Sequence, residues 1–244
     1  MNIDILQPET GYLGMPMIRI SDWQTLEDLM SAGAQVRAEH KRAYVFTAVP
    51  AENTALIRQL EASGYGFSEF RIRSLKQLNA QPGSTRSLYP YQAELIGDEE
   101  LLAKALELLD ATVKDDRLSG DEQIPEGFTR RRCRGNLEKS YSSYPSEFLL
   151  GVTNAHDGSL LAFRSGSFLS KTEVLYYQYG TSPALDAGHT TSMLDAFSEE
   201  FLYNRGIRLI HAVSTGFNIA ELNRLILSSN FRIHSSEVLM RKIV

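Results

Sequence analysis

One stretch of the chain, residues 173–231, alternates strand-like and helix-like patterns and constrains the fold more than any other. Aromatic residues typical of a strand at 176–179 are followed by the turn-forming run at 180–183. A helix is predicted over residues 186–204, because its apolar side chains recur three and four positions apart. Strands that alternate with helices in this way are typical of an α/β structure, in which helices pack against a sheet.

A second strand–helix unit follows in the same stretch. Residues 207–213 have the pattern of a short strand. Asn218 can cap the next helix, with Glu221 three positions later as in a capping box. Asn230 can then take the left-handed conformation that closes a helix.

The junction between the first strand and the first helix has the form of an anion site. The N–H groups of a first helical turn are unpaired, and the helix dipole adds positive potential there. A tight connection between a strand and a helix has the same form, so the pattern alone leaves both interpretations open. The residues concerned are Gly180, Thr181, Ala187, Gly188, His189, Thr190 and Thr191.

The segments 215–224 and 230–233 resemble the end of a GNAT acyltransferase domain. They share with it an Asn, an apolar helix and a small–Gly/Asn–Phe turn into the last strand. Within that superfamily the chain is most similar to the dTDP-fucosamine acetyltransferases of surface-polysaccharide synthesis. The resemblance covers about the last half of the chain well. It implies an α/β (α+β) GNAT fold, with a mixed central sheet flanked by helices and a truncated GNAT-like domain at the N-terminus.

The resemblance also implies an activity and a site. It implies transfer of an acyl group from acetyl-CoA, or another acyl-CoA, to the amine of a nucleotide-linked amino sugar. The acyl-CoA would lie between two splayed parallel strands, with its pyrophosphate on the helix that starts at Gly188. Asn218 and Asn223 complete the expected cofactor contacts.

Two features depart from the family pattern. The usual pyrophosphate loop reads Gln/Arg-x-x-Gly-x-Gly/Ala, and the matching residues here are Leu185, Gly188 and Thr190, so only the first glycine is kept. The hydroxyls of Thr190 and Thr191 can still hydrogen-bond a phosphate. Many members carry a tyrosine as general acid where this chain has Leu225, which cannot transfer a proton. Two alternatives therefore stay open: a degenerate GNAT-like ligand-binding protein without turnover, and a GNAT enzyme acting on another small amine.

Acyl transfer to an amine requires loss of the amine proton, a donor for the oxyanion and departure of the thiolate. The resemblance assigns the oxyanion donor to a backbone N–H of Tyr179 or Gly180, where the first splayed strand is irregular. His211 and His189 are the candidate bases, although a lone histidine in a strand, such as His211, is more often a core residue. Catalytic roles are therefore predicted for Tyr179 and His211.

The acceptor is expected to meet the polar segment 114–121. Arg117 suits a nucleotide diphosphate because a guanidinium can bind it in a bidentate manner. Asp121 and, on the strand, Tyr177 are the other predicted substrate contacts. A solvated loop would have the same composition, so this interpretation also stays open.

The first part of the chain repeats the pattern of the last part. A strand over 43–49, a cap at Asn53, a helix ending at Gly64 and a strand from Tyr65 echo the unit around Asn218 and Phe231. The repeat and the linker-like residues 81–84 predict a truncated GNAT-like domain over residues 1–82 and an acyltransferase domain over residues 83–244. The first copy has no evident glycine loop, so we expect no second active site there. A helix over residues 23–38 is predicted to be capped by Ser21.

Composition excludes several other classes of protein. A net charge of −5 argues against broad nucleic-acid binding, which requires a basic surface. A single cysteine, Cys133, cannot form an internal disulfide and fits a reducing compartment. No membrane span, signal peptide or metal-ligand spacing is apparent, so we expect a cytoplasmic protein without a metal. The expected partner is a small-molecule amine, and a homodimer is compatible with the sequence.

Overall fold

The computed structural model describes the chain except for residues 80–81, 83–87, 114–120, 122, 183–186 and 217, and for the side chains of residues 187–189. The strands are β1 (Asn2–Ile5), β2 (Met17–Ser21), β3 (Tyr44–Pro50), β4 (Gly66–Gln77), β5 (Tyr91–Leu95), β6 (Glu147–Asn154), β7 (Leu160–Phe168), β8 (Glu173–Thr181), β9 (Leu209–Thr215) and β10 (Arg232–Ile243). The helices are α1 (Gln7–Leu13), α2 (Leu26–Glu39), α3 (Thr54–Ala62), α4 (Glu99–Thr112), α5 (Phe128–Ser142), α6 (Ala187–Asn204) and α7 (Ile219–Asn223), which continues into the π-helix η2 (Arg224–Ser228).

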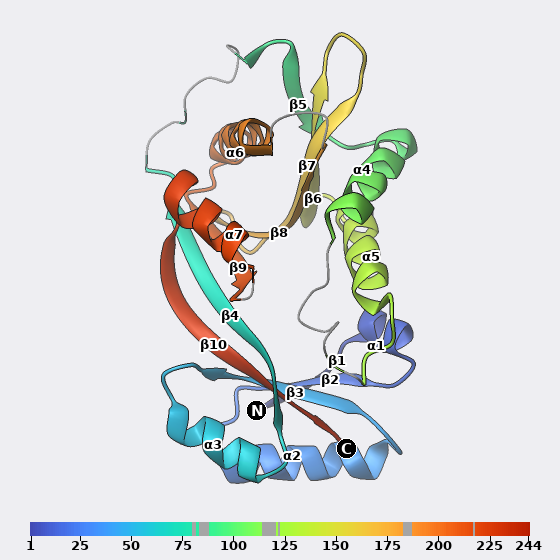
Figure 1. The fold of residues 1–244 in the computed structure, drawn as a ribbon, viewed down its shortest axis with the longest axis vertical. Coiled ribbons are helices and arrows are strands. Elements are labelled where there is room, and N and C mark those ends of the chain that lie inside the picture. The colour runs from blue at the N-terminus through green and yellow to red at the C-terminus, as the bar shows by residue number, and fades with distance from the viewer. Residues whose placement is uncertain (80–81, 83–87, 114–120, 122, 183–186, 217) are drawn as a thin grey trace.

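All these strands belong to one mixed sheet of ten strands, in the order β1-β2-β3-β10-β4-β9-β8-β7-β6-β5. The β2/β3 and β8/β9 pairs are parallel, and the other neighbours are antiparallel. Figure 1 shows two halves, one around β1–β3 and one around β5–β9, with the long strands β4 and β10 running between them. The predicted fold class, a mixed central sheet flanked by helices, is therefore confirmed.

The sheet contains two copies of one arrangement, related by an exchange of strands. The orders β1-β2-β3-β10 and β7-β8-β9-β4 correspond, and each contains a parallel pair joined through a helix, α2 or α6. The last strand of each copy lies in the other half, because β10 pairs with β3 and β4 pairs with β9. The two halves therefore share one continuous sheet, and the predicted domain boundary at residue 82 stays a prediction.

The repeat predicted from the sequence is present at its caps. The side chain of Asn53 accepts a hydrogen bond from the backbone N–H of Leu56, and that of Asn218 accepts one from Glu221. Counted from these caps, Leu56 corresponds to Glu221.

The repeat is also present at its closing turns. Gly64 and Asn230 both have positive φ, at 85° and 57°. Leu60 and Leu225 stand at the same distance from their caps, and both are buried. The second copy has one residue more between cap and closing turn, and the π-helix η2 accommodates it.

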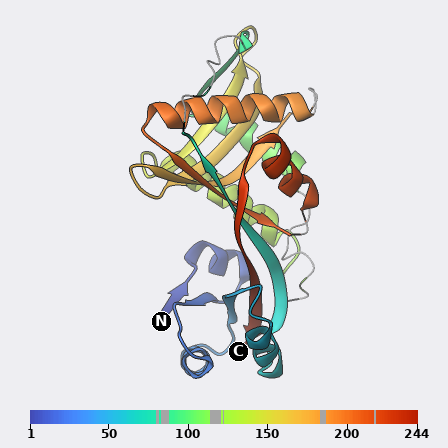
Figure 2. The same cartoon turned by 90° about the vertical axis from the view of Figure 1, so that its left-hand side faces the viewer.

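Helices cover both faces of the half that contains β5–β9, as the two ribbon views show (Figures 1 and 2). The apolar faces of α4 and α5 pack with residues such as Leu149 and Phe163 of the sheet. On the other face, α6 packs through Met193 and Phe197 against neighbours that include Val152. A separate core lies in the other half and unites α2, α3 and the strands β2 and β3.

Local predictions were accurate at α6 and wrong at the start of α2. Helix α6 ends at Asn204, as predicted. Helix α2 is capped by Thr25, whose side chain forms a capping box with Asp28, whereas the predicted cap, Ser21, ends strand β2. The elements β1, α1 and η2 were not predicted.

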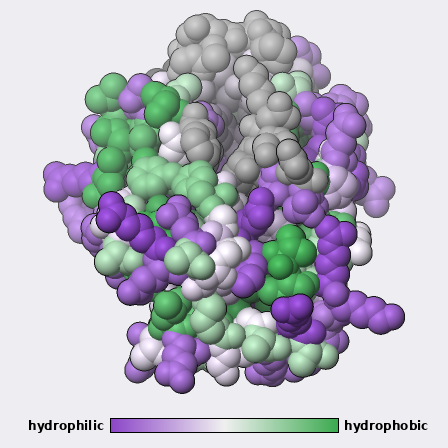
Figure 3. Space-filling view, turned by 60° about the horizontal axis from the view of Figure 1, so that its bottom comes forward, coloured by the Kyte–Doolittle hydropathy of each residue, from purple (hydrophilic) through white to green (hydrophobic). Residues whose placement is uncertain are grey.

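The surface of the molecule carries both hydrophilic and apolar residues (Figure 3). On the face in Figure 3, hydrophilic residues in purple border small apolar patches in green. Among the helices that the structure describes, none is long and apolar enough to cross a membrane.

Candidate functional site

The two parallel strands β8 and β9 separate partway along their length. They pair from Glu173 with Leu209 to Tyr176 with Ala212, and the described residues beyond these are not paired with each other. The opposite edge of β9 stays hydrogen-bonded to β4 as far as Thr215. We call the diverging ends, residues 177–181 of β8 and 213–215 of β9, the split.

Strand β8 is irregular next to the split. Its pairing with β7 passes from Gly166–Tyr176 to Arg164–Tyr179, so β8 carries one residue more than β7 over this interval. Such a bulge turns side chains three positions apart onto one face. The guanidinium carbon of Arg164 accordingly lies 4.5 Å from the ring centre of Tyr176 and 5.9 Å from that of Tyr179. The resemblance puts the oxyanion donor at an irregular point of this strand, at Tyr179 or Gly180.

Gly180 fits its position because a side chain has no room there. A Cβ at this residue would clash with Cε1 of the buried Phe163 ring. We therefore expect Gly180→Ala to lower the free energy of unfolding by about 1–3 kcal/mol, the usual cost of overpacking. Urea unfolding followed by circular dichroism measures this change. An unchanged midpoint would mean that the ring of Phe163 moves aside without cost.

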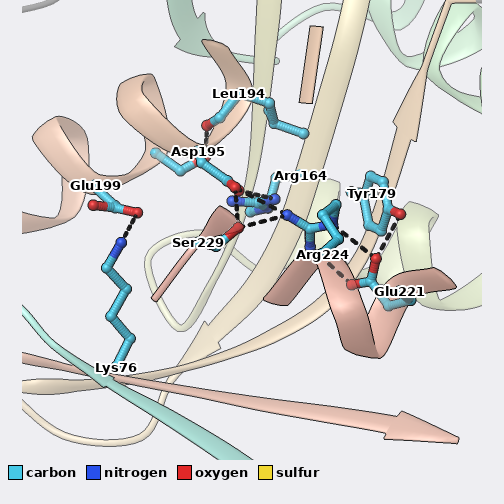
Figure 4. A network of polar contacts seen from close by, with 10 residues as sticks. Lys76, Arg164, Tyr179, Leu194, Asp195, Glu199, Glu221, Arg224 and Ser229 are labelled. Atoms are coloured by element: carbon cyan, nitrogen blue, oxygen red, sulfur yellow. Dashed lines mark hydrogen bonds and ion pairs between the residues drawn. The ribbon is translucent and has the colours of Figure 1, made fainter. Parts of the chain in front are cut away.

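A network of charged and polar side chains connects the split to the helices that cover it (Figure 4). The hydroxyl of Tyr179 donates a hydrogen bond of 2.6 Å to Oε2 of Glu221 on α7. Arg224 donates two hydrogen bonds of 2.8 Å to the same carboxylate. Its guanidinium carbon lies 4.8 Å from the centre of the Tyr179 ring. Burial, followed by the charge of Glu221, raises the pKa of Tyr179 to about 12, so its hydroxyl keeps its proton near neutral pH.

Asp195 of α6 is the central acceptor of this network. Its carboxylate binds Nη2 of Arg164 at 2.7 Å and Nη1 of Arg224 at 2.9 Å, and it accepts a hydrogen bond from Ser229. Arg164 is only 2% exposed, so this guanidinium depends on Asp195 for its charge compensation. Burial raises the pKa of Asp195, but Arg164 and Arg224 outweigh it and hold this pKa below its ordinary value.

The depressed pKa of Asp195 predicts an acid-dependent loss of stability. A carboxyl whose pKa is lower in the folded state stabilises the fold above its unfolded pKa, near 4, and loses this contribution as the pH falls through the folded value. The difference in unfolding free energy between wild type and Asp195→Asn should therefore shrink as the pH falls below about 4. Urea titrations at pH 7, 5 and 3 provide the measurement. A difference independent of pH would contradict the assigned ionisation of Asp195.

A second, partly buried ion pair lies one helical turn further along α6. Glu199 binds the ammonium of Lys76, which comes from β4. Burial is the main cause that raises the pKa of Glu199, against the lowering effect of Lys76. Asp195 and Glu199 therefore both point from α6 toward the sheet, each with a cationic partner (Figure 4).

Several predicted site residues gather at the split, because the C-terminal ends of parallel strands lie at one edge of a sheet. Thr181 ends β8, Gly188 and its neighbours Ala187 and His189 begin α6, and Asn218 caps α7. Thr190 and Thr191 are buried in the first turns of α6, and Asn223 is exposed at the end of α7. Their binding roles stay predictions.

Other predicted residues lie elsewhere. His211 stands in the paired part of β9, where its Nε2 is 2.9 Å from Oε2 of Glu173. Asp121 forms an ion pair with Arg241 and accepts a hydrogen bond from Tyr44, both on strands of the N-terminal half. Tyr177 is 43% exposed on β8. Arg117 and Leu185 lie outside the described residues.

In the N-terminal copy, the place where the parallel strands β2 and β3 stop pairing is filled by side chains of the protein itself. Beyond the pairing of Arg19 with Phe46, the buried hydroxyl of Thr47 donates to the carbonyl of Ile20 and accepts from the indole N–H of Trp23. The start of α2 is occupied as well, since Asp28 accepts hydrogen bonds from two backbone N–H groups there. The N-terminal copy thus places a carboxylate of its own at the start of α2.

Comparison with known proteins adds to this geometry. No family model matches the sequence, and no curated protein matches it. Among solved structures, the chain is similar to a GCN5-related N-acetyltransferase from Sphaerobacter thermophilus, with a TM-score of 0.66 and 14% identity over 99% of this chain and 76% of the other. It is also similar to another from Kribbella flavida, with a TM-score of 0.57 and 11% identity over 93% of this chain and 81% of the other.

Within the described residues, no three His, Cys, Asp or Glu side chains gather as they would around a metal ion.

A third similar structure is a tandem GNAT protein from the clavulanic acid biosynthesis pathway, with a TM-score of 0.57 and 12% identity over 94% of this chain and 76% of the other. The chain has the fold of the GCN5-related N-acetyltransferases, the GNAT fold.

Proposed function

We propose that the chain is an N-acyltransferase that takes its acyl group from acyl-CoA, most simply acetyl-CoA, bound in the split. The observation that carries this proposal is the divergence of β8 and β9 after Tyr176 and Ala212, directly before α6 begins. Diverging strands expose backbone N–H and C=O groups to which the amides of an extended pantetheine arm can bond. The first turn of α6, at Ala187 and Gly188, is the proposed site of the diphosphate, because the N–H groups of a first helical turn have no partner within the helix.

In this proposal the protein stabilises the transition state of acyl transfer and forms no covalent bond with the acyl group. The neutral amine attacks the thioester carbonyl and forms a C–N bond, which gives a tetrahedral oxyanion. Collapse of this oxyanion breaks the C–S bond and releases the thiolate of CoA, and the proton that the amine nitrogen loses passes to a base or to solvent. Backbone N–H groups at Tyr179 or Gly180, next to the bulge, are the proposed donors to the oxyanion. His211 is a weaker candidate for the base than expected, since Glu173 holds it in the paired part of the strands.

The acceptor proposed from the sequence resemblance is the amine of a nucleotide-linked amino sugar, in surface-polysaccharide synthesis in the cytoplasm. Of the three proposed acceptor contacts, Tyr177 is exposed on the strand that borders the split. Arg117 lies outside the described residues, and Asp121 is engaged by Arg241. A GNAT enzyme for another small amine therefore remains the first alternative for the acceptor.

A second candidate function is ligand binding without turnover. Leu225, which takes the position of the family's general acid, is 2% exposed and packs from η2 into the core. The bond between Tyr179 and Glu221 also crosses the split and occupies side chains that a substrate would need to meet. Both observations favour a protein that keeps the fold but has lost the chemistry.

Calorimetric titration with acetyl-CoA, followed by an amine panel, tests these proposals. We expect heat of binding from acetyl-CoA, and release of CoA thiol when the correct amine is present. The panel should include a nucleotide-linked amino sugar, amino acids and simple polyamines. No heat at millimolar acetyl-CoA would overturn the transferase proposal. Binding without thiol release from any amine would favour ligand binding without turnover.

A further inference from the structure

We propose that the hydrogen bond between Tyr179 and Glu221 is a latch that holds the split closed and must open before an acyl donor can enter. This inference rests on the proposed function. The bond joins β8, beyond its last residue paired with β9, to the helix that follows β9. It therefore spans the gap from one diverging arm to the element that continues the other.

The internal repeat shows that the latch is particular to this half of the chain. Counted from the two caps, Glu221 corresponds to Leu56, and Arg224 corresponds to Gln59. Leu56 packs in an apolar core in the first copy. The second copy thus has a carboxylate and a guanidinium where the first has an apolar side chain and an uncharged one.

The backbone of the second copy is also different at this point. The π-helix η2 begins at Arg224, and the first copy has an ordinary α-helix over the corresponding residues. Local π-turns in helices are frequent at functional sites, and in this one Arg224 binds Asp195 of α6 while Leu225 packs in the core. The inserted residue and the charged pair therefore occur together, over the split.

The two partners of the latch are held with different strength. Glu221 is fixed by two hydrogen bonds from Arg224, which is fixed in turn by Asp195 and Ser229. On the other side, the hydroxyl of Tyr179 has Glu221 as its hydrogen-bond partner and the ring lies against Arg224. Tyr179 is therefore the partner that moves, and opening leaves the charge pairs of Glu221, Arg224 and Asp195 intact.

A single-atom deletion tests the latch. Tyr179→Phe removes the hydroxyl and keeps the ring, so the closed state loses a hydrogen bond to a charged group. A bond of this kind corresponds to about tenfold or more in an equilibrium constant. Calorimetry with acetyl-CoA on the full chain should therefore give a Kd about tenfold lower for Tyr179→Phe than for wild type.

Two further variants complete the test. Tyr141→Phe removes a tyrosine hydroxyl from α5, on the opposite face of the sheet, and should leave the Kd at the wild-type value. Glu221→Gln weakens the same bond from its other partner and should also lower the Kd. Circular dichroism establishes that each variant is folded before titration.

The outcomes separate this inference from the function on which it rests. Wild-type binding with an equal or higher Kd in both Tyr179→Phe and Glu221→Gln overturns the latch and leaves the transferase proposal standing. Binding by Tyr179→Phe but not by wild type supports both. No binding by wild type or by any variant overturns both.

Discussion

Replacement of Asp195 by alanine is expected to lower the free energy of unfolding by about 3–5 kcal/mol, the usual cost of breaking a buried ion pair from one side. The carboxylate compensates two guanidinium groups, at 2.7 Å from Arg164 and 2.9 Å from Arg224. Without it, the buried guanidinium of Arg164 would lose its anionic partner, whereas Arg224 would keep its pair with Glu221. Arg164 cannot reach solvent without moving the strand that carries it. Urea unfolding at pH 7, followed by circular dichroism, measures the change.

The control for this experiment is an ion pair on the surface. Glu100 and Lys104 form an i,i+4 pair on α4, and the Glu100 side chain is 80% exposed. Glu100→Ala should change the unfolding midpoint far less, because solvent screens exposed pairs. If Asp195→Ala unfolds at the same urea concentration as wild type, the two arginines do not depend on this carboxylate, and the network of Figure 4 contributes little to stability.

The sequence predicted those parts of the fold that depend on neighbouring residues. Helix α6 ends at Asn204 because its apolar period stops there, and Asn218 caps α7 because its side chain reaches an N–H three residues away. The closing turn at Gly64 and the left-handed conformation of Asn230 were predicted for the same reason. Each of these signals lies within a few residues of the feature that it predicts.

The charged network could not be predicted in this way, because its members come from separate elements. Arg164 is on β7, Asp195 on α6 and Arg224 on η2, and no spacing in the sequence relates them. One feature of the sequence did indicate buried charges on α6. Asp195 and Glu199 stand one turn apart among the apolar positions of α6, and charges on the packed side of a helix require buried partners.

The exchange of β4 and β10 between the two halves could not be predicted from the sequence pattern either. The predicted strand from Tyr65 to Ser74 was correct in kind, and the structure extends it to Gln77. A strand pattern does not identify the partner strand, however, and β4 pairs with β9 and β10 of the C-terminal part of the chain. The copies therefore share a sheet, which a boundary at residue 82 does not convey.

Substitution of Gly188 by aspartate is expected to abolish acetyl-CoA binding without unfolding the protein. Gly188 is the second residue of α6, and an acidic side chain in a first turn favours the helix itself. The same carboxylate would face the diphosphate of the donor. Two like charges about 4 Å apart near a protein surface repel by about 4 kcal/mol, so binding should weaken by at least about a hundredfold.

Gly188→Ala is the matched control, because it adds a side chain at the same position without a charge. We expect calorimetry to detect acetyl-CoA binding by wild type and by Gly188→Ala, and none by Gly188→Asp at the same concentration. Circular dichroism and the urea midpoint should show that all three are folded. If Gly188→Asp binds acetyl-CoA as tightly as wild type, the diphosphate does not sit at the start of α6. The split between β8 and β9 would then have to accept a ligand that approaches from another direction.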